Sequence, residues 1–159
     1  MKQKTLGRWL KGTILAVGAV GLLVCLAVVP VMGMNLKEKY PEFAHCFWPW
    51  MVFILLTALP CFGMLVQGWK IAENIGNDRS FTMVNARLLK WIAVLSAGDA
   101  AFFFGGNIVL WLMNMSHPGV VLASLSAVLV GAVVAVAAAS LSHLVQKAAA
   151  LQEQSDWTI

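Results

Sequence analysis

The stretch GVVLASLSAVLVGAVVAVAAASL, residues 119–141, contains no charged side chain and is long enough to cross a bilayer as a helix. A helix rises 1.5 Å per residue, so about 20 apolar residues cross the roughly 30 Å hydrocarbon core of a bilayer. Comparable apolar stretches occupy residues 12–31, 47–67 and 88–113. Because a backbone in lipid must satisfy its own hydrogen bonds, the sequence predicts an all-α membrane protein with four transmembrane helices in one domain, residues 1–159.

The composition supports this assignment. Apolar residues make up 60% of the chain and charged residues only 11%, and there are seven Trp and eight Phe. A water-soluble domain of this size would leave far more apolar surface exposed than soluble proteins tolerate. We therefore expect the lipid bilayer to be the main partner of the chain.

The basic residues predict the orientation. Of the eleven Lys and Arg residues, only Lys37 and Lys39 flank the spans on one side. Cytoplasmic flanks carry the excess of basic residues in bacterial inner-membrane proteins, which places both termini in the cytoplasm. We expect the first span to stay uncleaved, because it is long for a signal peptide and no Ala-x-Ala site follows it. The nine residues on the predicted cytoplasmic side are Lys2, Lys4, Arg8, Lys11, Lys70, Arg79, Arg87, Lys90 and Lys147.

The connector NIGNDRSFTMVNARLLK, residues 74–90, predicts where two helices end and begin. The second helix should continue past its span and stop at Gly76, with Gly76 or Asn77 in the left-handed conformation. Thr82 suits the N-cap of the third helix, which would run to Asn114, on the order of 50 Å. Helices two, three and four are therefore predicted to extend into the cytoplasm, as a hairpin tip at residues 70–87 and a helical tail at residues 142–159.

The tip has two interpretations from its residues. In the first it is a solvated loop whose positive charges only set the topology. In the second it holds a small core and presents Arg79, Arg87 and Lys90 to lipid headgroups or to an acidic partner. The predicted core residues are Ile71, Ile75, Phe81, Val84 and Leu88.

The stretches KIAENIGNDRSFTMVNARLLKWIA (residues 70–93) and HPGVV to the terminal DWTI (residues 117–159) resemble the bacterial membrane family called domain of unknown function 2975. The matching positions include a Gly, a Phe-Thr pair with a following Asn and Leu, a Pro-Gly, and an acidic tail ending in Thr and a hydrophobic residue. They are Gly76, Phe81, Thr82, Asn85, Leu88 or Leu89, Pro118, Gly119, Glu153, Asp156, Thr158 and Ile159.

The resemblance implies a multi-span protein with a soluble partner, such as a small helix-turn-helix regulator encoded nearby. Together with the extended helices, it predicts a non-enzymatic regulatory or scaffold protein that presents a cytoplasmic helical platform. The candidate partner-binding residues are Asp78, Arg79, Phe81, Asn85, Arg87, Glu153, Asp156 and Thr158.

Asp99 lies near the predicted bilayer midplane. An ionised carboxylate there costs at least about 2.5–3.5 kcal/mol, so we expect a neutral group that faces other helices. Ser96 and Asn107 fall on the same helical face. One interpretation is a hydrogen bond to Thr57, Ser124 or Ser126 that joins two helices. The alternative is a proton or cation site in a small transporter or transporter subunit.

The fourth span carries small residues at every fourth position. Such a face lets another backbone approach closely, either the first span of the same chain, with Gly12 and Ala16, or a second copy. We expect packing within the chain, while the oligomeric state stays open. The residues are Ala123, Ala127, Gly131, Ala135 and Ala139.

Motifs for catalysis and cofactor binding are missing from the sequence. No Gly-x-Ser-x-Gly, His-Glu-x-x-His or phosphate-binding glycine loop occurs. Glu42, His45, Cys46 and His117 lack the spacing of a metal site, so we expect no metal and no cofactor. The net charge of +4 is accounted for by topology, and we expect no direct binding of nucleic acid.

Overall fold

The computed structural model describes residues 3–156. These residues form helices joined by short turns, with no strand among them, which confirms the predicted all-α fold. All four helical segments are long and apolar enough to cross a membrane. The elements are α1 (Gln3–Leu23), η1 (Val24–Val28), α2 (Val29–Lys39), η2 (Pro41–Cys46), α3 (Phe47–Gly76), α4 (Met83–Leu112) and α5 (Pro118–Asp156).

The segments α1, η1 and α2 form one continuous rod from Gln3 to Lys39. Its middle part, η1, is a π-helix, in which the Val29 N–H donates to the carbonyl oxygen of Val24 five residues earlier. Pro30 follows immediately. Proline has no N–H to donate and its ring crowds the preceding turn, so a widened turn at this point relieves the clash without breaking the rod.

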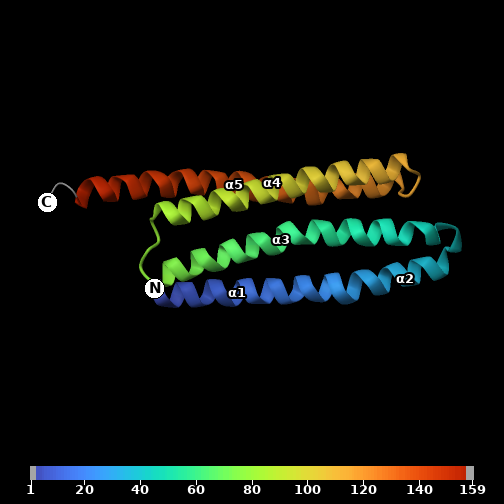
Figure 1. The fold of residues 1–159 in the computed structure, drawn as a ribbon, viewed down its shortest axis with the longest axis horizontal. Coiled ribbons are helices and arrows are strands. Elements are labelled where there is room, and N and C mark those ends of the chain that lie inside the picture. Colours follow the sequence, from blue (N-terminus) through green and yellow to red (C-terminus); the bar gives the residue numbers. More distant parts are fainter. Residues whose placement is uncertain (1–2, 157–159) are drawn as a thin grey trace.

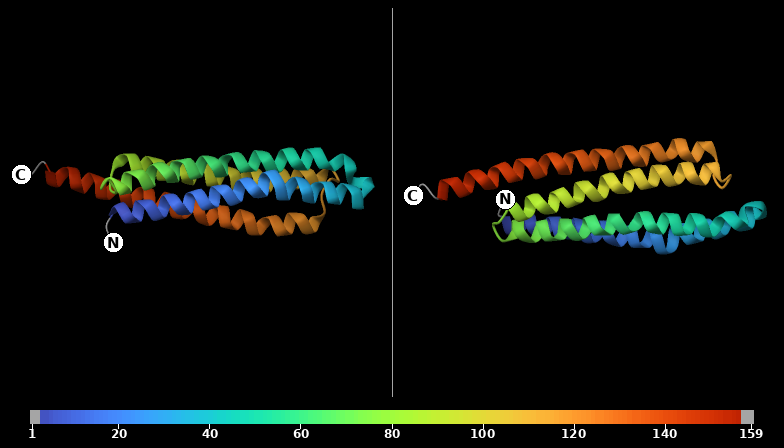
Figure 2. Two further views of the ribbon diagram at one scale, coloured as in Figure 1. Left: turned by 90° about the horizontal axis from the view of Figure 1, so that it is seen from below. Right: turned by 45° about the horizontal axis from the view of Figure 1, so that its top comes forward.

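The helices pack on one another in chain order, and Figure 1 shows them running along a common axis. Helix α1 packs on α3, α3 on α4, and α4 on α5. Within residues 3–156, neither α1 nor α2 runs beside α4 or α5, and α3 does not run beside α5. Figure 2 shows the same two hairpins, α1–α3 and α4–α5, from two further directions. The alternating directions bring Gln3 and Asp156 to the same end of the molecule, which we call the tip end.

The closest packing joins α4 and α5 through small side chains. The hydroxyl of Ser96 donates to the carbonyl oxygen of Gly131 at 2.8 Å, and Ser142 donates to Ala86 at 2.6 Å. Apart from Asn85, the buried positions on α4 and on α5 are separated by three, four or eleven residues, a repeat that keeps their side chains on one face of each helix. On α4 they are Ala86, Leu89, Ala93, Ser96, Asn107 and Leu110, and on α5 Ser124, Ala135, Ala138, Ser142, Val145 and Ala149.

This repeat corrects the predicted packing face of the fourth span. Ala135 is buried and Gly131 is half-buried against Ala100, as expected, but Ala123, Ala127 and Ala139 are exposed. Positions four apart drift by about 40° per step around a helix, so a strict four-residue row leaves the contact line after two steps. The neighbour of this face is α4, and not the first span.

Glycines allow α1 and α3 to approach closely at the tip end. A Cβ on Gly7 would lie 2.9 Å from both the Ala72 carbonyl oxygen and the Gly76 Cα. These are backbone atoms, which cannot rotate away. The contact therefore depends on the missing side chain of Gly7, the one buried residue of α1.

Candidate functional site

The turn between α3 and α4, residues 77–82, is a structured element that we call the tip. Helix α3 ends at Gly76, as predicted. The Arg79 N–H donates to the carbonyl oxygen of Asn74 and the Asp78 N–H to that of Ile75. This is the Schellman pattern, and its left-handed residue is Asp78 with φ of 58°. The prediction that Gly76 or Asn77 takes this conformation is therefore wrong by one or two residues.

Asn85 holds the tip from inside. Its side-chain amide donates to the carbonyl oxygens of Arg79 and Ser80, both at 2.9 Å, and its oxygen accepts from the Asn74 side chain at 2.7 Å. Its backbone N–H donates to the Thr82 hydroxyl at 3.3 Å, which confirms Thr82 as the N-cap of α4. Asn85 is only 1% exposed. It therefore shapes the tip and is not part of the contact surface to which the sequence assigned it.

The other predicted residues of this region lie on the outer surface of the tip and of the adjoining first turns of α4. Asp78, Arg79, Phe81 and Arg87 are all exposed, and Phe81 retains 59% of its accessible surface. Two of the five predicted core residues are wrong, because Phe81 and Val84 are exposed, while Ile71, Ile75 and Leu88 are half-buried. The observed core contains Ala86, Leu89 and Val145, with Ile71 packed against it.

Helix α5 continues beyond the tip. The hydrogen bonds Ser96–Gly131 and Ser142–Ala86 set an antiparallel register in which Lys90 of α4 is level with Ala138. Residues 119–138 would span about 30 Å, the thickness of the hydrocarbon core, and residues 139–156 would add about 27 Å. Figure 1 shows this end of α5 running past all the other helices.

Residues 139–156 of α5, which we call the projecting part, have two faces that carry apolar side chains. One face, with Ser142, Val145 and Ala149, is buried. The other keeps the same three-and-four spacing but is exposed, and consists of Leu141, Leu144, Ala148 and Leu151, of which Ala148 is half-buried. Glu153 is also exposed, while the side chain of Asp156 and all of Thr158 lie outside the described residues.

The three predicted intramembrane polar residues have different surroundings. Ser96 bonds to Gly131 of α5, and Asn107 bonds to the Phe103 carbonyl oxygen of its own helix at 2.8 Å. Asp99 instead faces α3, where its Oδ2 accepts a weak hydrogen bond from Cys61 Sγ at 3.5 Å. Its other oxygen, Oδ1, is buried and has no hydrogen-bond partner among residues 3–156.

None of the residues predicted to pair with Asp99 does so through an observed hydrogen bond. Thr57 donates to Ile54 and Ser124 donates to Val121, each within its own helix. Hydroxyl groups in helices readily bond to the preceding turn, so they need no partner from another helix. Asp99 contacts Cys61 of α3 instead, and the hydrogen bonds between α4 and α5 are made by Ser96 and Ser142.

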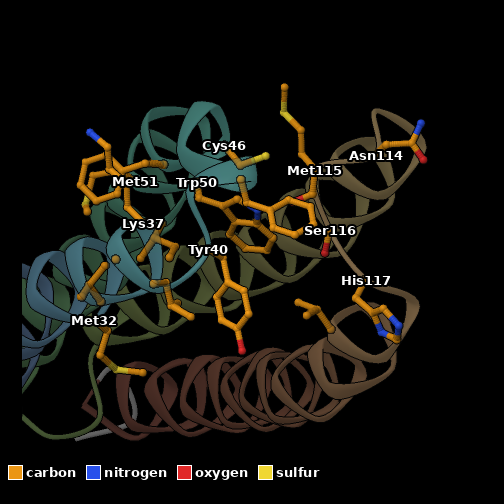
Figure 3. Close-up of a pocket in the computed structure, with 17 residues that line it drawn as sticks. Met32, Lys37, Tyr40, Cys46, Trp50, Met51, Asn114, Met115, Ser116 and His117 are labelled. Atoms are coloured by element: carbon orange, nitrogen blue, oxygen red, sulfur yellow. The ribbon is translucent and has the colours of Figure 1, made fainter.

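A groove at the opposite end of the molecule, which we call the far end, was not predicted from the sequence. It lies between α2, the start of α3 and the turn that leads into α5 (Figure 3). Trp50 donates from Nε1 to the Met115 carbonyl oxygen at 2.8 Å and so ties α3 to this turn. No local pattern in the sequence predicts this groove, because a single span does not reveal a gap between two hairpins.

The family model described as "Protein of unknown function (DUF2975)" matches residues 31–159. The chain belongs to this family. Among its relatives is the "Uncharacterized membrane protein YoaS" of Bacillus subtilis (strain 168), 26% identical over 153 residues that cover 95% of this chain and 96% of the relative. No solved structure matches the chain. The predicted resemblance to the DUF2975 family is thus confirmed, together with the assignment as a membrane protein.

Proposed function

We propose that this DUF2975 protein is a non-enzymatic scaffold of the bacterial inner membrane that binds a soluble regulatory protein at its tip end. The proposal rests on one observation: α5 continues as a helix beyond the level of Lys90, with an apolar face that no other helix covers among the described residues. The excess of basic residues at the tip end supports a cytoplasmic position for this face.

The exposed apolar face suits another helix. Leu141, Leu144, Ala148 and Leu151 repeat the spacing by which α5 already packs on α4. An amphipathic helix of a partner would bury these side chains in the same way, as in other helix-in-groove complexes. Leu151 is 66% exposed and lies in the projecting part, so its burial would contribute about 1.5–3 kcal/mol to binding.

Charges at the tip favour an acidic partner. Arg79 is exposed in the tip, Arg87 is exposed on α4 and Lys147 is exposed on α5. Rim charges of this kind steer a partner of opposite charge and set the orientation of the complex more than its affinity. We therefore expect the partner helix to carry Asp or Glu residues beside its apolar face.

Crosslinking inside cells tests the proposal. A photo-crosslinking amino acid is introduced at Phe81, at Leu151 and, as a control, at Leu129, which is exposed in the lipid-facing part of α5. We expect one discrete adduct with a soluble protein from positions 81 and 151 and none from position 129. If positions 81 and 151 yield no adduct in cells that produce the protein, the scaffold function is wrong.

Purified components provide the second arm of the test. The protein identified by crosslinking should co-elute with the wild type and with Gln152→Asp, which adds the same charge one residue away. Leu151→Asp should reduce binding by about tenfold or more, since a buried leucine is worth about 1.5–3 kcal/mol. Equal recovery of the partner protein with both variants would show that the exposed face of α5 does not take part in the interaction.

A small transporter is the second candidate function, and one observation favours it. Asp99 Oδ1 is buried between α3 and α4 without a hydrogen-bond partner among the described residues. An unpaired intramembrane carboxyl group is a site where a proton or cation can bind. Proton flux into vesicles containing the purified protein should then exceed the flux into protein-free vesicles and fall to that level in Asp99→Asn. Flux equal to protein-free vesicles in the wild type would reject this candidate.

A further inference from the structure

The groove at the far end has a volume of about 670 Å³. Ligand sites in proteins usually measure about 300–1,000 Å³. Helix α2 lies beside α3 but not beside α5. The groove is the gap that this leaves between α2 and α5. Figure 3 shows Tyr40 projecting across this gap toward α5. The groove therefore opens toward the lipid between α2 and α5.

The length of the groove matches one leaflet of a bilayer. Its lining on the first rod runs from Val29 to Tyr40. Most of this stretch belongs to α2, so its ends are about 16 Å apart. The hydrocarbon core measures about 30 Å across, and one leaflet supplies half of that. An acyl chain that enters from the leaflet would fit along the groove in the direction it already takes in the membrane.

The polarity of the lining changes along the same direction. Val29, Met32 and Ile54 form the deeper walls and offer only apolar atoms. Tyr40, Ser116 and His117 bring hydroxyl and imidazole groups to the end that lies near the α4–α5 turn. An apolar bottom with polar groups at one end is complementary to an amphiphile.

Ser116 gives this end a specific chemistry. Its hydroxyl oxygen is buried and has no hydrogen-bond partner among residues 3–156, although the residue lines the groove. A buried hydroxyl without a partner costs about 1–3 kcal/mol, and nearly all such groups in folded proteins are paired. A turn of the Ser116 side chain toward the groove would let a ligand oxygen accept from this hydroxyl and would remove this cost.

We propose that the groove binds one acyl chain of an ester-linked phospholipid and that the Ser116 hydroxyl donates to the ester carbonyl oxygen. In a phospholipid this oxygen lies where the hydrocarbon ends and the headgroup begins, and Ser116 lies at the corresponding end of the groove. Trp50, whose indole N–H is already paired with Met115, forms a rigid wall at the same level. The lipid would then bridge α2 and α5, which are not in contact with each other, beside the existing contact between Trp50 and Met115.

Photolabelling tests the groove. The full-length protein is reconstituted with a phospholipid that carries a diazirine near the end of one acyl chain, and labelled peptides are quantified by mass spectrometry. We expect the peptides that contain Met32 and Met51 to be labelled more strongly than the peptide that contains Leu15, which is exposed elsewhere on the first rod. Equal labelling of all lipid-facing peptides would show ordinary annular lipid and would overturn the proposal.

Filling the groove should remove the extra labelling. Val120→Trp places a large side chain in the groove, while Leu122→Trp adds the same side chain two residues along α5, outside the groove lining. Met32→Trp fills the groove from the opposite wall and serves as a second variant if Val120→Trp folds poorly. Unchanged labelling of Met51 in a folded Val120→Trp or Met32→Trp protein would contradict the proposal.

An ether-linked analogue tests the role of Ser116, because it keeps the acyl-chain length but lacks the ester carbonyl oxygen. In the wild type we expect the analogue to compete about fivefold less well than the ester lipid, since one hydrogen bond contributes about 1 kcal/mol. In Ser116→Ala the two lipids should compete equally. Equal competition in the wild type would overturn the assignment of the ester to Ser116.

Discussion

The Ser142 hydroxyl donates a 2.6 Å hydrogen bond to the carbonyl oxygen of Ala86, and it does so in the buried contact between α5 and α4. The same register is set by Ser96 and Gly131, which lies eleven residues before Ser142 in α5. Two short side chains thus fix how far one helix slides along the other. This register leaves the end of α5 uncovered, and the proposed scaffold function depends on it.

Ser142→Leu should destabilise the α4–α5 hairpin. Ser142 is 9% exposed, and overpacking a tight contact typically costs about 1–3 kcal/mol. Ser142→Ala should cost only about 0.6 kcal/mol, the average for a hydrogen bond between membrane helices. Equilibrium unfolding in mixed detergent micelles measures both. Ser140→Leu is the control, because Ser140 is exposed on the same helix, and an equal loss in this variant would contradict the assigned register.

Gly7→Ala and Gly12→Ala should have opposite effects on stability. A Cβ on Gly7 meets backbone atoms of Ala72 and Gly76 at 2.9 Å, whereas a Cβ on Gly12 meets nothing within 4 Å. Gly7→Ala should therefore lower the thermal unfolding temperature by separating α1 from α3. Gly12→Ala should leave it unchanged or raise it, because alanine is favoured over glycine in a helix by up to about 1 kcal/mol. Two variants with the same change would show that α1 does not pack at Gly7.

Asn85→Ala should destabilise the folded conformation of the tip. The substitution removes the donors for the Arg79 and Ser80 carbonyl oxygens and leaves the Asn74 side chain without its partner. Loss of such a buried network costs about 1–3 kcal/mol, which raises the open population of the tip by about 5-fold to 150-fold. Tryptic cleavage after Arg79 measures this opening directly.

Asn77→Ala is the matched control for the tip, because Asn77 lies in the same turn but is exposed. Its cleavage rate should stay close to that of the wild type. If Asn77→Ala and Asn85→Ala are cleaved at the same rate, the buried amide does not hold the tip.

The features that depend on neighbouring residues could be predicted from the sequence. The four spans follow from length and hydrophobicity, and the end of α3 at Gly76 and the Thr82 cap follow from residues within one helical turn. Which residue takes the left-handed conformation is harder to predict, because neighbouring residues are almost equally suited to it. Asn and Asp both tolerate this conformation, so the choice of Asp78 over Asn77 depends on which carbonyl groups remain to be capped.

The features that depend on contacts between helices could not be predicted in the same way. Helix α5 has small residues at both four-residue and 3.5-residue intervals, and only the presence of α4 selects Ser124, Ala135 and Ser142 over Ala123, Ala127 and Ala139. The burial of Asn85 depends on Asn74, eleven residues earlier on another helix. The groove has no local pattern at all, because it is the space that two hairpins leave between them.

The scaffold function requires the tip end to lie in the cytoplasm, and cysteine labelling measures its side of the membrane. Single cysteines at Asp78, at Ser155 and at His117 are introduced into a variant without Cys25, Cys46 and Cys61, and intact cells are treated with a thiol reagent that cannot cross the inner membrane. We predict labelling at position 117 only, with positions 78 and 155 labelled after the membrane is opened. Labelling of position 78 or 155 in intact cells would contradict the account.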